Sequence, residues 1–188
     1  GGGEEPTTYL MGTVGGPISD TLSAKISFFN NKDDGYFKNQ FNGNSIGKSD
    51  VLAVRPMIVW SPTDKTSLTM IYDYFDSDGD GPVSQNHANG LGISNSSANF
   101  DRNSFDVSID EEGSIDVRSD FLRAILEVDT ENGVITNIFG YRDYKSNAVS
   151  DIDSTPLSFF HAPSALTSEQ ISNETRWSGQ VTEKAQLT

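Results

Sequence analysis

The feature that most constrains the fold of this chain is a strict alternation of apolar and polar side chains. Segment 21–28 shows it most clearly, with apolar residues at every second position: Leu22, Ala24, Ile26 and Phe28. A period of two indicates a β-strand rather than a helix. The pattern recurs in segments 8–14, 51–60, 67–75, 118–128, 134–145 and 169–178, and we expect a short further strand within 184–188. The sequence therefore predicts an all-β fold, an antiparallel up-and-down meander of about seven to eight strands.

The connections between these segments alternate between short and long. Segment 61–64 is a tight Ser-Pro turn, and 129–133 ends in the strong hairpin signal Asn-Gly. Connections 30–50, 76–117 and 146–167 are instead long and polar, and the first is expected to carry a hairpin within 36–41. Transmembrane barrels place tight turns on one side and long loops on the other. The alternation of short and long connections therefore predicts a segment of a transmembrane β-barrel, with short turns on one side and long loops on the other.

Composition excludes several classes of function. The 188 residues carry a formal net charge of -14, from 27 acidic and 13 basic residues, so the chain repels phosphate backbones and no nucleic-acid partner is expected. The absence of cysteine removes disulfides, thiolate metal ligands and cysteine nucleophiles. No nucleophile-elbow motif is present, and we expect the chain not to be an enzyme.

The sharpest local motif is the run 76–81, Asp-Ser-Asp-Gly-Asp-Gly. Asp76, Asp78 and Asp80 are spaced like the ligands in the first half of an EF-hand loop, which predicts calcium as the ion bound. The twelfth position is His87 where that loop has a bidentate glutamate. An ordinary acidic, solvated loop is the alternative interpretation, and both stay open here.

Two further groups of residues are candidates for contact with a ligand. Tyr36 and Phe37 lie in the first long loop, where aromatic side chains suit a ligand-binding surface. The polar strand faces carry charged residues that either line a barrel lumen or contact a plug or a passing ligand: Lys25, Arg55, Arg123, Glu127 and Arg176.

Several sequence blocks resemble one known family. They are GGPISDTL at 15–22, DGYFKN at 34–39, WSPTD at 60–64, YRDY at 141–144 and EQISNETRWSG at 169–179. In their order and spacing they resemble the barrel domain of TonB-dependent outer-membrane receptors. The family's last block more often reads Phe-Ser-Gln-Glu-Leu-Arg, and here Ile171, Asn173 and Thr175 replace its phenylalanine, glutamine and leucine.

The resemblance implies a barrel of about 22 strands plugged by an N-terminal domain. It implies uptake of a scarce ligand, such as an iron–siderophore chelate, across the bacterial outer membrane. The partners would be outer-membrane lipid, the plug and remaining strands, and an inner-membrane energy-coupling complex acting through the plug. Residues 1–188 are expected to form a partial barrel with neither plug domain nor terminal aromatic strand.

Two alternatives follow from the residues. One is a soluble or secreted β-sandwich binding module with a calcium loop, and the other is a small closed outer-membrane barrel. A sandwich predicts that Leu22, Ala24, Ile26 and Phe28 are buried within the chain. A lipid-facing wall predicts that the chain leaves them uncovered.

Overall fold

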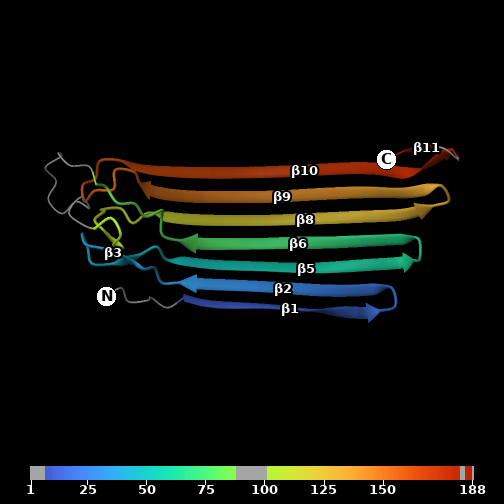
Figure 1. The fold of residues 1–188 in the computed structure, drawn as a ribbon, viewed down its shortest axis with the longest axis horizontal. Helices are drawn as coiled ribbons and strands as arrows, with labels where there is room; N and C mark the ends of the chain where they lie inside the picture. Colours follow the sequence, from blue (N-terminus) through green and yellow to red (C-terminus); the bar gives the residue numbers. More distant parts are fainter. Residues whose placement is uncertain (1–6, 88–100, 183–184, 188) are drawn as a thin grey trace.

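The computed structural model describes residues 7–87, 101–182 and 185–187, and its main element is one long antiparallel sheet. The strands follow the order β1-β2-β5-β6-β8-β9-β10-β11 across the sheet (Figure 1). Their bounds are β1 (Thr7–Ser19), β2 (Leu22–Asp33), β5 (Ser49–Thr63), β6 (Thr66–Gly79), β8 (Ser114–Thr130), β9 (Gly133–Asp151), β10 (His161–Thr182) and β11 (Ala185–Leu187). The predicted all-β antiparallel meander is confirmed.

The ends of the sheet differ in the way the sequence predicted. Residues 20–21, 64–65 and 131–132 make two-residue turns at one end. The described parts of the longer connections, 34–48, 80–87, 101–113 and 152–160, lie at the other end, as Figure 1 shows. These longer connections fold together into a body that we call the loop cap, made of 34–48, 80–87, 101–113 and 152–160.

Several strands run further than predicted on their loop-cap side. The expected loop from Asp76 is instead the last part of β6, where Asp78 pairs with Asp50 of β5 and with Asp116 of β8. Side chains there are polar on both faces, so the apolar alternation ends while the backbone ladder continues. The predicted strand boundaries near 75 and 118 were therefore wrong by several residues.

Pro56 lies in the central strand β5, opposite Ile26 of β2. Proline has no N–H to donate to a ladder, and within sheets it is normally confined to a bulge or an edge position. The structure shows neither: the β5–β6 register resumes unshifted from Val54↔Tyr74 to Met57↔Ile71, and only the pairs between them are missing. A local gap in one ladder thus accommodates the ring.

The pairing register defines two faces of the sheet, because directly paired residues point to the same side. The face that carries Leu22, Ala24 and Ile26 is here called the apolar face. Through the register it also carries Val14, Ile58, Trp60, Leu68, Met70, Tyr72, Leu122, Leu126, Ile135, Phe139, Tyr141, Ile171 and Trp177. The opposite, charged face carries Lys25, Arg55, Asp73, Arg123, Glu127, Arg142, Glu174 and Arg176.

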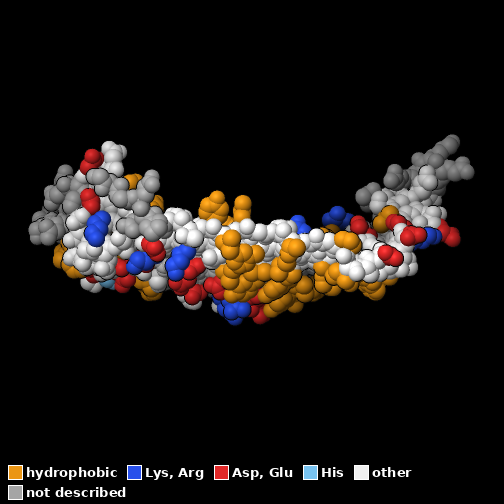
Figure 2. Space-filling view, turned by 90° about the horizontal axis from the view of Figure 1, so that it is seen from below, with side chains coloured by type: hydrophobic (Ala, Val, Ile, Leu, Met, Phe, Trp, Pro, Cys, Tyr) orange, Lys and Arg blue, Asp and Glu red, His pale blue; other side chains and the backbone are white. Residues whose placement is uncertain are grey.

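The sheet is a single layer, and the described chain covers neither face (Figures 1 and 2). Ile26 is 45% exposed, and Leu22, Ala24 and Phe28 are partly exposed. The buried face that a sandwich predicts is not found among the described residues. Figure 2, which looks at the sheet edge-on, shows a long thin body that is thicker at the loop cap, with hydrophobic side chains over much of its middle.

The sheet also has two open edges in the described part of the chain. β1 pairs only with β2, and β11 pairs with β10 only over Gly179–Thr182. The predicted eighth strand is therefore present as β11. It is not paired with β1, so the sheet does not close into the small barrel of the third hypothesis.

The loop cap contains a second, three-stranded sheet and the only apolar core among the described residues. Its strands are β3 (Phe37–Asn39), β4 (Ser45–Ile46) and β7 (Asp106–Val107), in the order β4-β3-β7. Ile46, Val107 and Ile109 are at most 1% exposed, with Phe37 and Val83 packed against them. A hairpin beyond the main sheet is thus present, but it spans 37–46 and so extends past the expected 36–41, with Gly43 at φ 84° in its turn.

Candidate functional site

The loop cap is held together by polar side chains that link its three connections. The Asp80 carboxylate accepts hydrogen bonds from the N–H groups of Gly47 and Lys48, both at 3.0 Å. Asn42 and Asn44 both donate to Glu112 Oε1, at 2.7 and 2.8 Å. These contacts join the first connection to the second.

A buried amide strengthens the same junction. Asn39 is fully buried, and its side chain donates to the Ile109 carbonyl at 2.9 Å and accepts from the Ile109 N–H at 3.2 Å. The side chain in this way substitutes for a strand partner, which satisfies backbone groups that would otherwise be costly to bury. The third connection is joined through Asn86, which donates to the Asp153 carbonyl at 2.6 Å.

The predicted ligand contacts Tyr36 and Phe37 belong to an aromatic cluster on the loop cap. Their ring centroids lie 4.6 Å apart, and Phe105 meets them edge-on at 5.1 and 5.8 Å. Tyr36 and Phe105 are more than half exposed. Sequence analysis missed Phe105 because it lies in a different connection without periodicity.

A recess of about 560 Å³ opens beside this cluster. Its wall combines Phe37, Phe105 and Val83 with the polar side chains of Gln85 and Arg102. The Gln85 side chain is already hydrogen-bonded within the loop cap, because it donates to the carbonyls of Ser104 and Asp106 at 3.0 and 2.7 Å. Most of its other lining residues are polar as well, among them Ser84, His87 and Asn103, so the recess is a polar hollow with one aromatic side.

The predicted calcium ligands do not form an ion-binding loop. Asp76 and Asp78 lie in the extended strand β6, where a chain cannot wrap around an ion, and Asp76 accepts from the Tyr74 hydroxyl at 2.7 Å. Asp80 follows the strand and holds Gly47 and Lys48 instead. The predicted loop was wrong because strand pairing with β5 and β8 continues through this acidic run.

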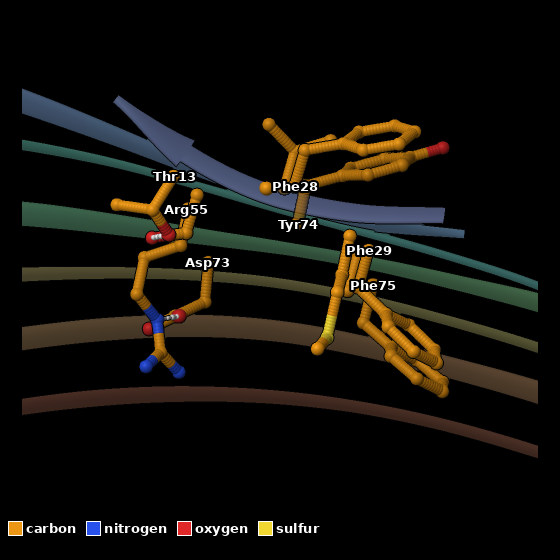
Figure 3. A pocket seen from close by; sticks show the side chains of 12 residues that line it. Thr13, Phe28, Phe29, Arg55, Asp73, Tyr74 and Phe75 are labelled. Atoms are coloured by element: carbon orange, nitrogen blue, oxygen red, sulfur yellow. Dashed lines mark hydrogen bonds and ion pairs between the residues drawn. The ribbon is translucent and has the colours of Figure 1, made fainter. Parts of the chain in front are cut away.

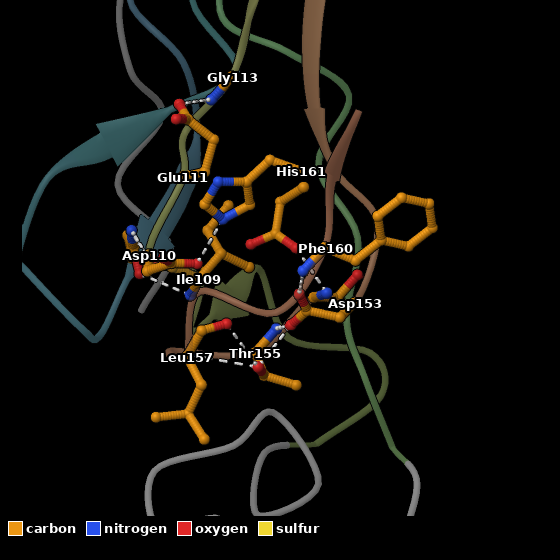
Figure 4. A network of polar contacts seen from close by, with 12 residues as sticks. Ile109, Asp110, Glu111, Gly113, Asp153, Thr155, Leu157, Phe160 and His161 are labelled. Carbon is orange, nitrogen blue, oxygen red and sulfur yellow. Dashed lines mark hydrogen bonds and ion pairs between the residues drawn. The ribbon is translucent and has the colours of Figure 1, made fainter. Parts of the chain in front are cut away.

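The structure brings together a different set of possible metal ligands, Asp110, Asp151 and His161 (Figure 4). One ligand atom from each lies within 4.8 Å of the others. His161 Nε2 is 3.1 Å from Asp110 Oδ1, and this hydrogen bond raises the pKa of the imidazole. Burial raises the pKa of the Asp151 carboxyl.

The charged face of the sheet carries a second polar group. Asp73 bridges two cations, forming ion pairs with Arg55 and, at 2.8 Å, with Arg123. Figure 3 shows Arg55 and Asp73 on one side of the sheet together with Phe29 and Phe75, and Phe28 and Tyr74 on the other side. This arrangement fits the polar strand face predicted from the alternation.

Comparison of the chain with models of known protein families, with curated proteins and with solved structures finds no match. Among the described residues there is no helix that is long and apolar enough to cross a membrane.

Proposed function

We propose that this chain is a section of the wall of a TonB-dependent receptor barrel in the bacterial outer membrane. The apolar face would contact lipid, the charged face would line the lumen, and the loop cap would lie outside. The observation that carries the proposal is the single-layer sheet itself, which has uncharged side chains at mid-height on one face and charged side chains at the same height on the other.

The apolar band supports a lipid contact. Residues that pair with one another across successive strands form a row. Four successive rows on the apolar face contain no charged side chain, and they cross β6 at Thr66, Leu68, Met70 and Tyr72. The next row, at Tyr74, already includes Asp120 and Asp143. The stretch 66–74 is close to the ~9–11 residues that a tilted strand needs to cross a bilayer.

Aromatic side chains border this band on both sides. Trp60 and Trp177 lie on the apolar face near the two-residue turns, and Tyr72 and Tyr74 lie at the border toward the loop cap. Both tyrosine hydroxyls donate to carboxylates, that of Tyr72 to Asp120 and that of Tyr74 to Asp76. Aromatic girdles at both interfaces are typical of outer-membrane barrels.

The charged face suits a wet lumen. Arg55, Asp73 and Arg123 lie at the height of the apolar band but on the other side of the sheet. Such a cluster facing hydrocarbon would cost several kcal/mol per charge. Facing water or a plug domain, it can hold the strands in register and offer contacts to that plug.

The open edges call for further strands. Among the described residues, β1 has one strand neighbour, and the outer edge of β10 is unpaired from His161 to Ser178. Unpaired backbone groups are not tolerated in hydrocarbon, so the wall needs strands on both sides to close. A barrel of the size that the family resemblance implies would supply them.

The receptor class rests on the sequence blocks at 15–22, 34–39, 60–64, 141–144 and 169–179. The block at 15–22 includes the two-residue turn 20–21, and the block at 34–39 includes the aromatic pair Tyr36 and Phe37 of the loop cap. In a receptor of this class the recess beside Phe105 would meet the arriving ligand.

Uptake of ferric iron tests the receptor half of the proposal. The chain is expressed within its complete barrel, in bacteria that lack their own iron receptors, and radioactive ferric siderophore is supplied. We expect uptake that an uncoupler of the inner membrane abolishes. Uptake that the uncoupler leaves unchanged, or no uptake for any ferric or cobalamin ligand offered, would contradict the assignment to this class.

A further inference from the structure

Three side chains that can bind a metal converge where the loop cap joins the sheet. Asp151 is the last residue of β9 and lies directly opposite His161, the first residue of β10. Asp110 comes from the second connection, where Ile109 is fixed in the core of the loop cap and the Asp110 N–H donates to the Thr155 carbonyl at 3.2 Å. The cluster is therefore positioned by a strand pair and by a packed core.

One oxygen of this cluster is buried without a hydrogen-bond partner. Asp151 is 6% exposed, and its Oδ1 accepts the Ser154 N–H at 2.7 Å. Its Oδ2 has no partner among the described residues. A buried carboxylate oxygen left unsatisfied is costly, and a bound cation is one way to satisfy it.

We propose that Asp110, Asp151 and His161 bind a divalent transition-metal ion of the zinc class. Two carboxylates and one imidazole suit Zn²⁺ or Mn²⁺, whereas Ca²⁺ and Mg²⁺ prefer oxygen ligands alone. On binding, the ion takes the place of the proton shared by His161 Nε2 and Asp110 Oδ1, and that proton leaves to solvent. Solvent or a ligand group fills the remaining coordination positions.

The geometry is close to that of a three-ligand site. Zinc bonds of about 2.0–2.2 Å place tetrahedral ligand atoms roughly 3.3–3.5 Å apart. The three ligand atoms lie within 4.8 Å of one another, so binding would draw them closer together. The side chains of His161 and Asp110 are 27% and 16% exposed, which leaves an entry path from solvent. Glu111 and Asp153 lie close by and add to the negative potential.

Such an ion would connect the second connection of the loop cap to the end strands of the sheet. It would stabilise the loop cap in proportion to the logarithm of the metal concentration, since the ligands converge only in the folded state. The proposal is independent of the membrane location and of the receptor class.

Zinc titration of the purified full chain, free of added histidine residues, tests the site. The readout is competition with a coloured zinc chelator at neutral pH, comparing the wild type with Asp151→Asn and His161→Gln. Asp151→Asn keeps the shape of the side chain and His161→Gln replaces the ring with a polar amide, and hydrogen exchange of the loop cap checks that folding is retained in both. We expect each variant to weaken zinc binding by about 10–100-fold or more.

Two matched variants serve as controls. His87→Gln removes the other histidine of the chain, and Asp34→Asn removes an exposed carboxylate. Both should bind zinc like the wild type. Zinc binding that is unchanged in His161→Gln, that falls equally in His87→Gln, or that is absent at millimolar zinc would overturn the proposal.

Discussion

The sheet and the loop cap differ in how far they bury their apolar side chains. The loop cap buries Ile46, Val107 and Ile109 among its own connections, although it is built mostly from polar residues. The sheet holds most of the long apolar side chains of the described residues, and yet Val14 is 71% and Ile171 is 72% exposed. The region with fewer apolar residues is the one that has a core.

The difference indicates what each region needs from its surroundings. The loop cap has a small core of its own, although it leaves aromatic side chains such as Phe159 and Phe160 more than half exposed. The sheet leaves an apolar face and two edges uncovered, and lipid together with neighbouring strands would cover both. Three changes test this contrast, one in the loop cap and two in the sheet.

Ile109→Ala should have the largest effect. It leaves a cavity in the small core of the loop cap, and we expect it to destabilise the loop cap by about 2–5 kcal/mol. Hydrogen exchange should show faster exchange in 34–48 and 101–113 while β2, β5 and β6 stay protected. Ile152→Ala, at a residue of the loop cap that is 50% exposed, is the control and should change little. Equal loss of protection throughout the sheet would mean that the two regions share one core.

Ala24→Arg tests the apolar face in the Met70 row, in the middle of the uncharged band. An arginine facing the middle of a bilayer on a barrel strand costs about 2–4 kcal/mol, so the free energy of unfolding in lipid vesicles should fall by that amount. Ser23→Arg, on the charged face of the same strand, should cost less than about 1 kcal/mol. Similar costs for the two variants would show that the faces do not differ in their surroundings.

Asp73→Asn tests the charged face and should have the smallest of the three effects. It leaves Arg55 and Arg123 without their shared carboxylate, and we expect a loss of about 1–2 kcal/mol in urea unfolding. Asp50→Asn removes an exposed pair with Lys32 at 3.6 Å and should cost about 0–1 kcal/mol. A larger loss of unfolding free energy for Asp50→Asn than for Asp73→Asn would contradict the greater stabilisation expected from the ion pairs of Asp73.

Sequence analysis predicted the sheet well, because each face of a strand leaves its own period-two signal. The alternation of Leu22, Ala24, Ile26 and Phe28 depends only on neighbours along the chain. The same signal fails at Asp76 and Asp78, because both faces there are polar and only the backbone pairing continues. Strand ends therefore could not be predicted from the side chains.

The candidate sites of the loop cap were harder to predict. Tyr36 and Phe37 are adjacent in the chain and were found, whereas their contact with Phe105 depends on how two connections pack. Likewise, Asp110 meets Asp151 and His161 only after β9 and β10 pair and the Ile109 core forms. No local pattern links these three residues.

Depth-dependent quenching of tryptophan fluorescence tests the central claim most directly. Both tryptophans of the chain, Trp60 and Trp177, lie on the apolar face, so their emission reports on that face alone. A second variant, in which Trp60 and Trp177 are changed to phenylalanine and Val59 is changed to tryptophan, reports on the charged face. In vesicles with brominated acyl chains, we predict strong quenching of the native tryptophans and weak quenching of the Val59→Trp variant. Equal quenching of both, or quenching of the native tryptophans only by aqueous iodide, would contradict a lipid-facing wall.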